Sequence, residues 1–112
     1  MIAVMLRLVA QPGKREELAR RVKEEVFGPT RKEAGCIRYR FYQDVENPDA
    51  FSFVEEWESW DALNDHFRSE HVSHFLADLG DLIGEPPEAG FHEVARSRGL
   101  EAVDEARQSI PA

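Results

Sequence analysis

Residues 2–9 read Ile-Ala-Val-Met-Leu-Arg-Leu-Val, a short apolar run that stops at Gln11-Pro12-Gly13. A run of this length before a Pro-Gly break suits a β-strand better than a helix. Both alternating faces of this strand are apolar, and Arg7 is the exception. A strand that is apolar on both faces must be covered on both faces. We therefore expect helices on one side of it and a second molecule on the other.

The pattern changes after Lys14, where Leu18, Val22 and Val26 recur at every fourth position among charged residues. This spacing predicts an amphipathic helix. Gly28-Pro29 is expected to kink or break the helix, and Ala34-Gly35 is expected to end the segment after that break.

Residues 36–43 and 51–57 read as two strands of a hairpin around the turn-forming residues 44–49. A hairpin centred on Asn47 would pair Ile37 with Trp57, Tyr39 with Glu55, Phe41 with Phe53 and, on the other face, Arg38 with Glu56. This register combines aromatic pairs with an opposite-charge pair, as cross-strand preferences favour.

Two further helices are indicated after the hairpin. Ser59 is a good N-cap for a helix that contains Trp60, Leu63 and Phe67, and Ser69 for a second one that runs on towards Gly84. Residues 91–96 are expected to form the last strand of a domain that spans residues 1–97. In the tail, residues 98–112, a short helix would carry Leu100, Val103 and Ala106 on one side; it would pack on a partner or fray.

The order of elements is β-α-β-β-α-β, which predicts an α+β, ferredoxin-like fold with an antiparallel sheet. Two helices cover one face of such a sheet. The other apolar face of the first strand then requires a homodimer with sheet-on-sheet packing, a dimeric α/β barrel.

The composition of this 112-residue chain limits the kinds of molecule that it is expected to bind and the compartment in which it is expected to work. A net charge of −8 argues against nucleic acid and anionic membrane surfaces. The single cysteine, Cys36, cannot form an internal disulfide. The apolar N-terminus is too short for a transmembrane helix and lacks the flanks of a signal peptide. A cytoplasmic protein is expected.

Three segments resemble the antibiotic biosynthesis monooxygenase family, and in particular its YgiN-like quinol monooxygenase branch. They are residues 33–39 (EAGCIRY), 53–57 (FVEEW) and 62–72 (ALNDHFRSEHV), within a likeness that covers residues 2–96. The resemblance implies a dimer with a cavity between each sheet and its helices. It also implies oxidation of a small quinol, phenol or polyketide-like aromatic by O₂ as co-substrate, without metal, haem or flavin. The alternatives are a non-enzymatic dimeric ligand-binding module and an isomerase of the same superfamily.

The family's site residues carry over in part. Members that oxidise aromatic polyketides use a tryptophan, an asparagine, a tyrosine and an arginine; Trp57 matches the tryptophan, while Phe53, Leu63 and Ala77 occupy the other places. Haem-degrading members use an asparagine, a tryptophan and a histidine, where this chain has Leu6, His66 and Leu76. Haem is therefore not expected.

The candidate catalytic residues are His66, Trp57 and Glu55, and the candidate substrate-binding residues are Tyr39, Phe53 and His71. His66 is either a general base near neutral pH or a packed histidine with one hydrogen bond. Glu55, on an aromatic strand face, is either an acid/base with a raised pKa or a structural acceptor.

A metal site is not expected. His66, His71 and His74 could suggest one, but an i, i+5 spacing does not share a helix face. No cysteine or carboxylate is expected to complete the ligand set.

Overall fold

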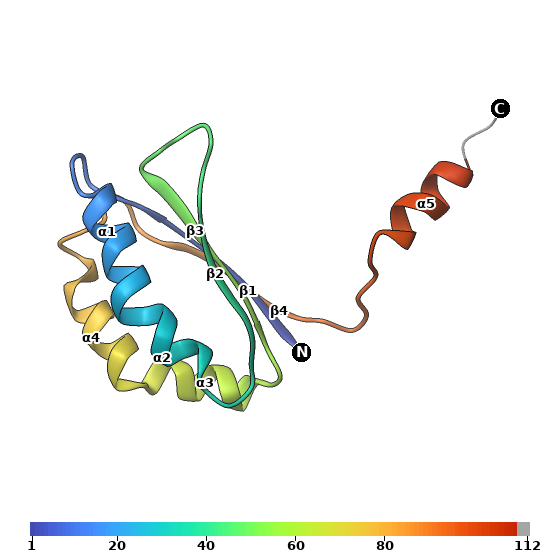
Figure 1. The fold of residues 1–112 in the computed structure, drawn as a ribbon, viewed down its shortest axis with the longest axis horizontal. Helices are drawn as coiled ribbons and strands as arrows, with labels where there is room; N and C mark the ends of the chain where they lie inside the picture. The colour runs from blue at the N-terminus through green and yellow to red at the C-terminus, as the bar shows by residue number, and fades with distance from the viewer. Residues whose placement is uncertain (110–112) are drawn as a thin grey trace.

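The computed structural model describes residues 1–109, which form a four-stranded antiparallel sheet with helices on one face (Figure 1). The elements are β1 (Ile2–Val9), α1 (Arg15–Arg21), the π-helix η1 (Val22–Val26), α2 (Phe27–Arg31), β2 (Cys36–Gln43), β3 (Ala50–Trp57), α3 (Trp60–Arg68), α4 (Glu70–Leu79), β4 (Glu88–Glu93) and α5 (Glu101–Gln108). The strand order is β2-β3-β1-β4. The predicted ferredoxin-like fold is confirmed. Within residues 1–109, no helix is both long and apolar enough to cross a bilayer.

β1 lies inside the sheet, between β3 and β4, as its two apolar faces indicate. On its inner face Val4 and Leu8 are fully buried under the helices. On its outer face Met5 is 59% exposed, because α1 to α4 all lie on the other side of the sheet (Figure 1). Arg7 also lies on this outer face, in register with Ser52 and Glu88.

The first helix is not broken at Gly28-Pro29; of the two predicted outcomes, a kink or a break, the break is wrong, and the helix is irregular just before the proline. It continues to Arg31 and widens into the π turn η1 just before the proline. There the Phe27 N–H donates to the Val22 carbonyl, five residues back. A proline inside an α-helix lacks a donor and its ring crowds the carbonyl four residues earlier. The wider turn relieves this conflict, and the proline falls in the first turn of α2.

The hairpin register is confirmed for three pairs, which join Tyr39 to Glu55, Phe41 to Phe53 and Arg38 to Glu56. The last of these is an ion pair with 3.2 Å between Nε and Oε1. The expected pairing of Ile37 with Trp57 is wrong, because the register shifts between Cys36 and Arg38 and Cys36 takes that place. Ile37 is left 51% exposed in the resulting bulge.

Both predicted serine caps are confirmed. The Ser59 hydroxyl oxygen accepts from the Ala62 N–H at 3.1 Å, and that of Ser69 accepts from the Val72 N–H at 3.4 Å. The extended backbone at Ser69 separates α3 from α4 and changes the direction of the chain between them.

The last strand begins and ends earlier than predicted, at Glu88–Glu93 instead of 91–96. It is an exposed edge strand, so its side chains carry little of the apolar alternation that locates a buried strand. The short helix expected in the tail is present as α5. Positions 110–112 of that tail lie outside the described residues.

Gly35, in the turn between α2 and β2, has a positive φ of +84° and sits against α3. A Cβ added there would lie 2.5 Å from the Ala62 Cβ, whereas one added at Gly13, where φ is +82°, would meet nothing within 4 Å. Gly13→Ala should therefore cost only the backbone strain, about 1–2 kcal/mol. Gly35→Ala should cost roughly 1–3 kcal/mol more. Urea unfolding of both variants measures the difference, and equal losses would contradict the close approach to Ala62.

Candidate functional site

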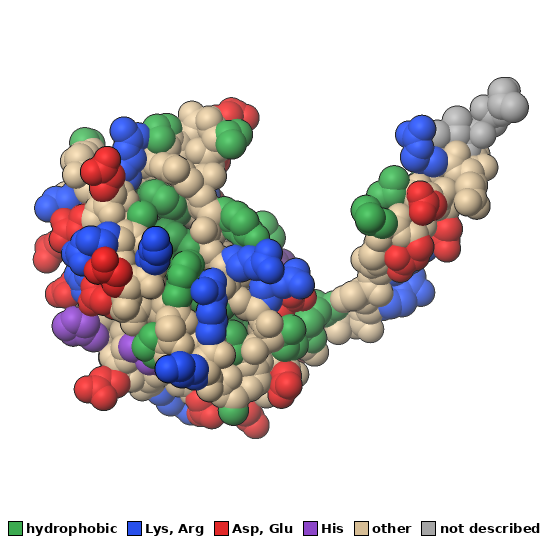
Figure 2. Space-filling view, in the orientation of Figure 1, with side chains coloured by type: hydrophobic (Ala, Val, Ile, Leu, Met, Phe, Trp, Pro, Cys, Tyr) green, Lys and Arg blue, Asp and Glu red, His purple; other side chains and the backbone are tan. Residues whose placement is uncertain are grey.

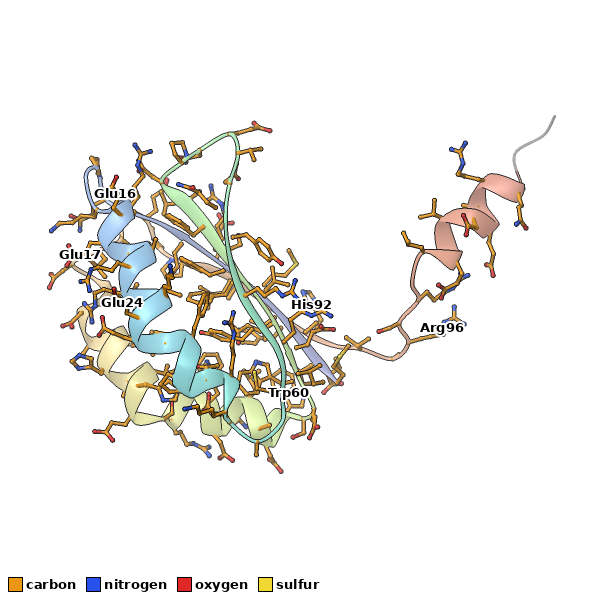
Figure 3. All side chains as sticks on the ribbon, in the orientation of Figure 1. Glu16, Glu17, Glu24, Trp60, His92 and Arg96 are labelled. Carbon is orange, nitrogen blue, oxygen red and sulfur yellow. The ribbon has the colours of Figure 1, made fainter. Side chains whose placement is uncertain are left out.

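An apolar cavity of about 110 Å³ lies between the inner face of the sheet and the helices. Its lining is Leu6, Leu8, Val26, Tyr39, Phe53, Glu55, His66, Phe67, Val72, Phe75, Leu76, Leu79 and Pro87. Figure 3 shows side chains of the sheet and the helices meeting in this layer. Within residues 1–109, the lining contains one carboxyl group, that of Glu55, and one imidazole, that of His66. It contains no lysine or arginine. An engineered apolar cavity of about 150 Å³ holds benzene, and this space is somewhat smaller, so it limits a ligand to about one small ring.

Glu55 lies on the inner face of β3 and is only 2% exposed. The Trp57 Nε1–H donates to its Oε1 at 2.9 Å. Burial raises the pKa of the Glu55 carboxyl to about 7, the negative charge of Glu33 adds to the rise, and the Trp57 hydrogen bond opposes it. Glu55 therefore holds a proton in part of the molecules at neutral pH, and it can both donate and accept one.

His66 comes from α3 and is also 2% exposed. Its Nδ1 lies 2.7 Å from Glu33 Oε2. Burial lowers the pKa of the imidazole, although the adjacent Glu33 acts in the opposite direction. Because a carboxylate only accepts, Nδ1 carries the hydrogen and Nε2 keeps its lone pair. No group within residues 1–109 is hydrogen-bonded to Nε2, and His66 is one of the residues that line the cavity.

Aromatic rings hold the imidazole in place. The ring centroid of His66 lies 4.6 Å from that of Trp57 and 5.3 Å from that of Tyr39. Tyr39 in turn contacts Phe53 at 5.4 Å. Burial raises the pKa of the Tyr39 hydroxyl far above its usual range, so this side chain stays a neutral phenol. These contacts leave the imidazole little freedom to rotate.

His71, at the start of α4, lies behind His66 and outside the cavity lining. Its Nε2 is 3.1 Å from the Thr30 hydroxyl oxygen and 3.4 Å from Glu33 Oε2. Thr30 is fully buried. His71 therefore helps to hold the Glu33 carboxylate that orients His66.

Glu33, His66 and His71 are also the residues of the described chain that could hold a metal ion, since their donor atoms all lie within 4.8 Å of one another. Both sequence arguments against such a group are wrong. The break at Ser69 brings His66 and His71 together from two helices, and Glu33 supplies a carboxylate. However, donors around a tetrahedral zinc lie roughly 3.3 Å apart, given bonds of about 2.0–2.1 Å. The 2.7 Å contact of His66 with Glu33 is that of a direct hydrogen bond.

The structure brings the six sequence-predicted site residues to one region in two layers. Tyr39, Phe53, Glu55 and His66 line the cavity. Trp57 and His71 support the lining from behind: Trp57 donates a hydrogen bond to Glu55, and His71 Nε2 lies 3.4 Å from Glu33 Oε2. The sequence reasoning missed Glu33 itself. Glu33 lies in a turn, where no periodic pattern marks it, and only the docking of α3 brings His66 against it.

Comparison with known proteins agrees with this architecture. Residues 1–78 match the family model described as antibiotic biosynthesis monooxygenase. The Mycobacterium tuberculosis protein Rv0793 is 32% identical over 85 residues, which are 76% of this chain and 82% of Rv0793. Its structure superposes with a TM-score of 0.80 and 26% identity, and the match covers 88% of this chain and 98% of that one.

Two further relatives extend the comparison. An uncharacterised Synechocystis protein, sll1783, is 31% identical over 99 residues, which are 88% of this chain and 67% of the relative. The structure of PA3566 from Pseudomonas aeruginosa has a TM-score of 0.77 and 27% identity, covering 85% of this chain and 94% of that one. The family model covers well over half of the chain, and the chain belongs to the antibiotic biosynthesis monooxygenase family.

Proposed function

We propose that this protein is a cofactor-independent monooxygenase of the quinol-oxidising, YgiN-like kind, which acts on a small neutral quinol or phenol with O₂ as co-substrate. The observation that carries the proposal is the pair of buried proton-transfer groups, His66 and Glu55, on the wall of an apolar cavity. An oxygenase without a cofactor must deprotonate an electron-rich ring and keep bulk water away from it. This cavity offers both conditions.

The first step is proton removal by His66. Nε2 takes the proton of a substrate hydroxyl, and the Glu33 carboxylate stabilises the imidazolium that forms because it lies 2.7 Å from Nδ1. This arrangement resembles the orienting carboxylate of a hydrolase triad in its physical role. The contacts of Tyr39 and Trp57 with the imidazole ring of His66 hold its orientation while its charge changes.

The second step is oxidation of the quinolate. One electron passes from the ring to O₂, the two radicals combine at a ring carbon, and the resulting hydroperoxide loses water. The sum is quinol plus O₂ giving hydroxyquinone plus H₂O. Glu55 in its protonated form is placed to donate the proton that the departing hydroxide needs, and the raised pKa keeps this form populated near pH 7.

The cavity favours a neutral substrate. Its described lining offers no cation to pair with a phosphate or carboxylate, and Glu55 and Glu33 would repel one. This observation disfavours the isomerase alternative for a phosphorylated sugar. The uncovered outer face of the sheet, with Met5 exposed, supports the homodimer with sheet-on-sheet packing.

Oxygen consumption with ¹⁸O₂ tests the proposal. Hydroquinone, methylhydroquinone and a carboxylated hydroquinone are offered, and buffer alone corrects for autoxidation. We expect uptake with the neutral quinols, one ¹⁸O atom in each product molecule, much slower uptake with the carboxylated analogue, and no loss of rate after chelation with EDTA. Quinol binding without oxygen uptake would contradict the enzyme and favour the ligand-binding module; loss of activity in EDTA would contradict the cofactor-independent mechanism.

A further inference from the structure

The C-terminal arm carries a helix, α5, that packs on no other element of the part of the chain that the structure describes. α5 stands away from the body of the molecule (Figure 1), and none of its residues is buried. Leu100 is 82% exposed and Val103 53% exposed. Helices shorter than about 12 residues are marginal in water without tertiary contacts. The eight residues of α5 therefore need a docking surface to remain helical.

The two sides of α5 differ in character. At 100° per residue, Val103 and Ala106 share one side with Leu100, and Arg107 in the last turn falls on that side too. Asp104 and Glu105 lie on the other side with Glu101. Figure 2 shows the apolar and the acidic side chains on different sides of the arm. α5 is therefore an acidic amphipathic helix. The surface that it docks on should be apolar with a basic rim.

A groove of that kind runs between the first helix and the β2 edge of the sheet, with a volume of about 630 Å³. We call it the β2 groove, and its floor is formed by Phe27, Phe41 and Phe51. Lys23 and Arg31 supply cations along its helix side, in a chain whose net charge is −8. The Arg31 guanidinium also donates to the Tyr39 carbonyl and lies over the Phe27 ring. Gly28 also lines it, and a Cβ there would meet nothing within 4 Å, so the groove is open at that point.

We propose that α5 docks in the β2 groove of a second copy of this chain, with Leu100 and Val103 on the aromatic floor and the acidic side chains towards Lys23 and Arg31. The charge of Asp104 complements that of Lys23, while Glu105 already pairs with Arg98 within the arm. The apolar stripe of α5 matches the apolar floor. This is the helix-in-groove mode of recognition.

The sheet order explains why the groove belongs to another molecule. The arm leaves from β4, at the edge of the sheet opposite to β2. In a face-to-face dimer whose two-fold axis runs parallel to the strands, β4 of one copy lies over β2 of the other. Packed sheets are about 10 Å apart. The seven residues between β4 and α5 can span roughly 23 Å. That length crosses the layer and leaves roughly 13 Å to pass the β2 edge to the helix side of the second sheet, where the groove lies.

Photo-crosslinking in the full-length chain tests the docking. Val103 is replaced by p-benzoylphenylalanine, and ¹⁴N- and ¹⁵N-labelled chains are mixed before irradiation so that mass spectrometry separates crosslinks between copies from those within one. We expect mixed-isotope crosslinks that map to the β2 groove. Three outcomes would each overturn the proposal. They are crosslinks within one chain, crosslinks elsewhere on the second copy, and a yield of crosslinks no higher than in a sample that is irradiated at a dilution where the chain is monomeric.

Variants in the groove sharpen the test. Gly28→Trp should fill the groove and lower the crosslink yield at least tenfold, whereas Gly28→Ala should leave the yield unchanged. Lys23→Glu should also lower it, and the added change Asp104→Lys should restore it by exchanging the charges. Circular dichroism checks that each variant is folded. A yield that none of these changes moves would contradict docking in this groove.

Discussion

Replacing Glu55 by glutamine should stabilise the protein at alkaline pH by about 3 kcal/mol and change its stability little near pH 5. The pKa of this carboxyl is about 7 in the folded protein and 4.5 in the reference state. Between these values the native state holds a proton that the unfolded chain has lost, so stability falls as pH rises through the window. A difference of about 2.5 pKa units corresponds to about 3 kcal/mol.

Glutamine removes this loss because it cannot ionise. Its side-chain oxygen can still accept from the Trp57 Nε1–H, which donates to Glu55 at 2.9 Å. For a domain of this size the gain at pH 8.5 corresponds to a rise in Tm of roughly 12 °C or more. Urea unfolding at pH 5 and 8.5, at one fixed protein concentration, measures the effect, and Glu58→Gln at an exposed position is the control. An unchanged pH slope in the Glu55 variant would show that this carboxyl does not titrate in the window.

Replacing His66 by alanine should lower kcat/KM for a neutral quinol by about 10²- to 10⁴-fold, the usual contribution of a positioned general base. The imidazole lines the cavity and Glu33 holds its Nδ1–H, so its removal eliminates the proton acceptor and leaves Glu33 without that partner. His74→Ala is the matched control, because His74 lies on α4 with a side chain that is 68% exposed. We expect oxygen uptake by the His74 variant to equal that of the original protein.

Three further measurements separate the chemistry from the folding. His66→Gln retains most of the side-chain volume and an N–H for Glu33, and it should be folded yet as slow as the alanine variant. Added imidazole should restore part of the rate of His66→Ala by entering the vacated space. Glu33→Gln should show an intermediate rate, because the amide still accepts from Nδ1 but does not stabilise the imidazolium. A fully active and folded His66→Gln would exclude His66 as the base.

Much of the fold followed from local patterns. The apolar run of residues 2–9, with two apolar faces, predicted the inner strand, and the apolar spacing of Leu18, Val22 and Val26 predicted the first helix. Ser59 and Ser69 cap their helices because a serine side chain satisfies free backbone N–H groups wherever a helix begins. The aromatic pairing of residues 39–41 with 53–55 set most of the hairpin register. Each of these interactions joins neighbours along the chain or across one turn.

The sequence by itself determined the layers of this protein and which side chains face its interior, because apolar periodicity specifies one buried face for each element. It also pointed to Glu55, buried on an aromatic face. Only the tertiary structure decided that His66 meets Glu33, 33 residues away, and that His71 joins them from a separate helix. The tertiary structure also decided the bulge at Ile37 and the early start of β4. The physical reason is that a turn residue carries no periodic signal, so its partners depend on how whole elements pack.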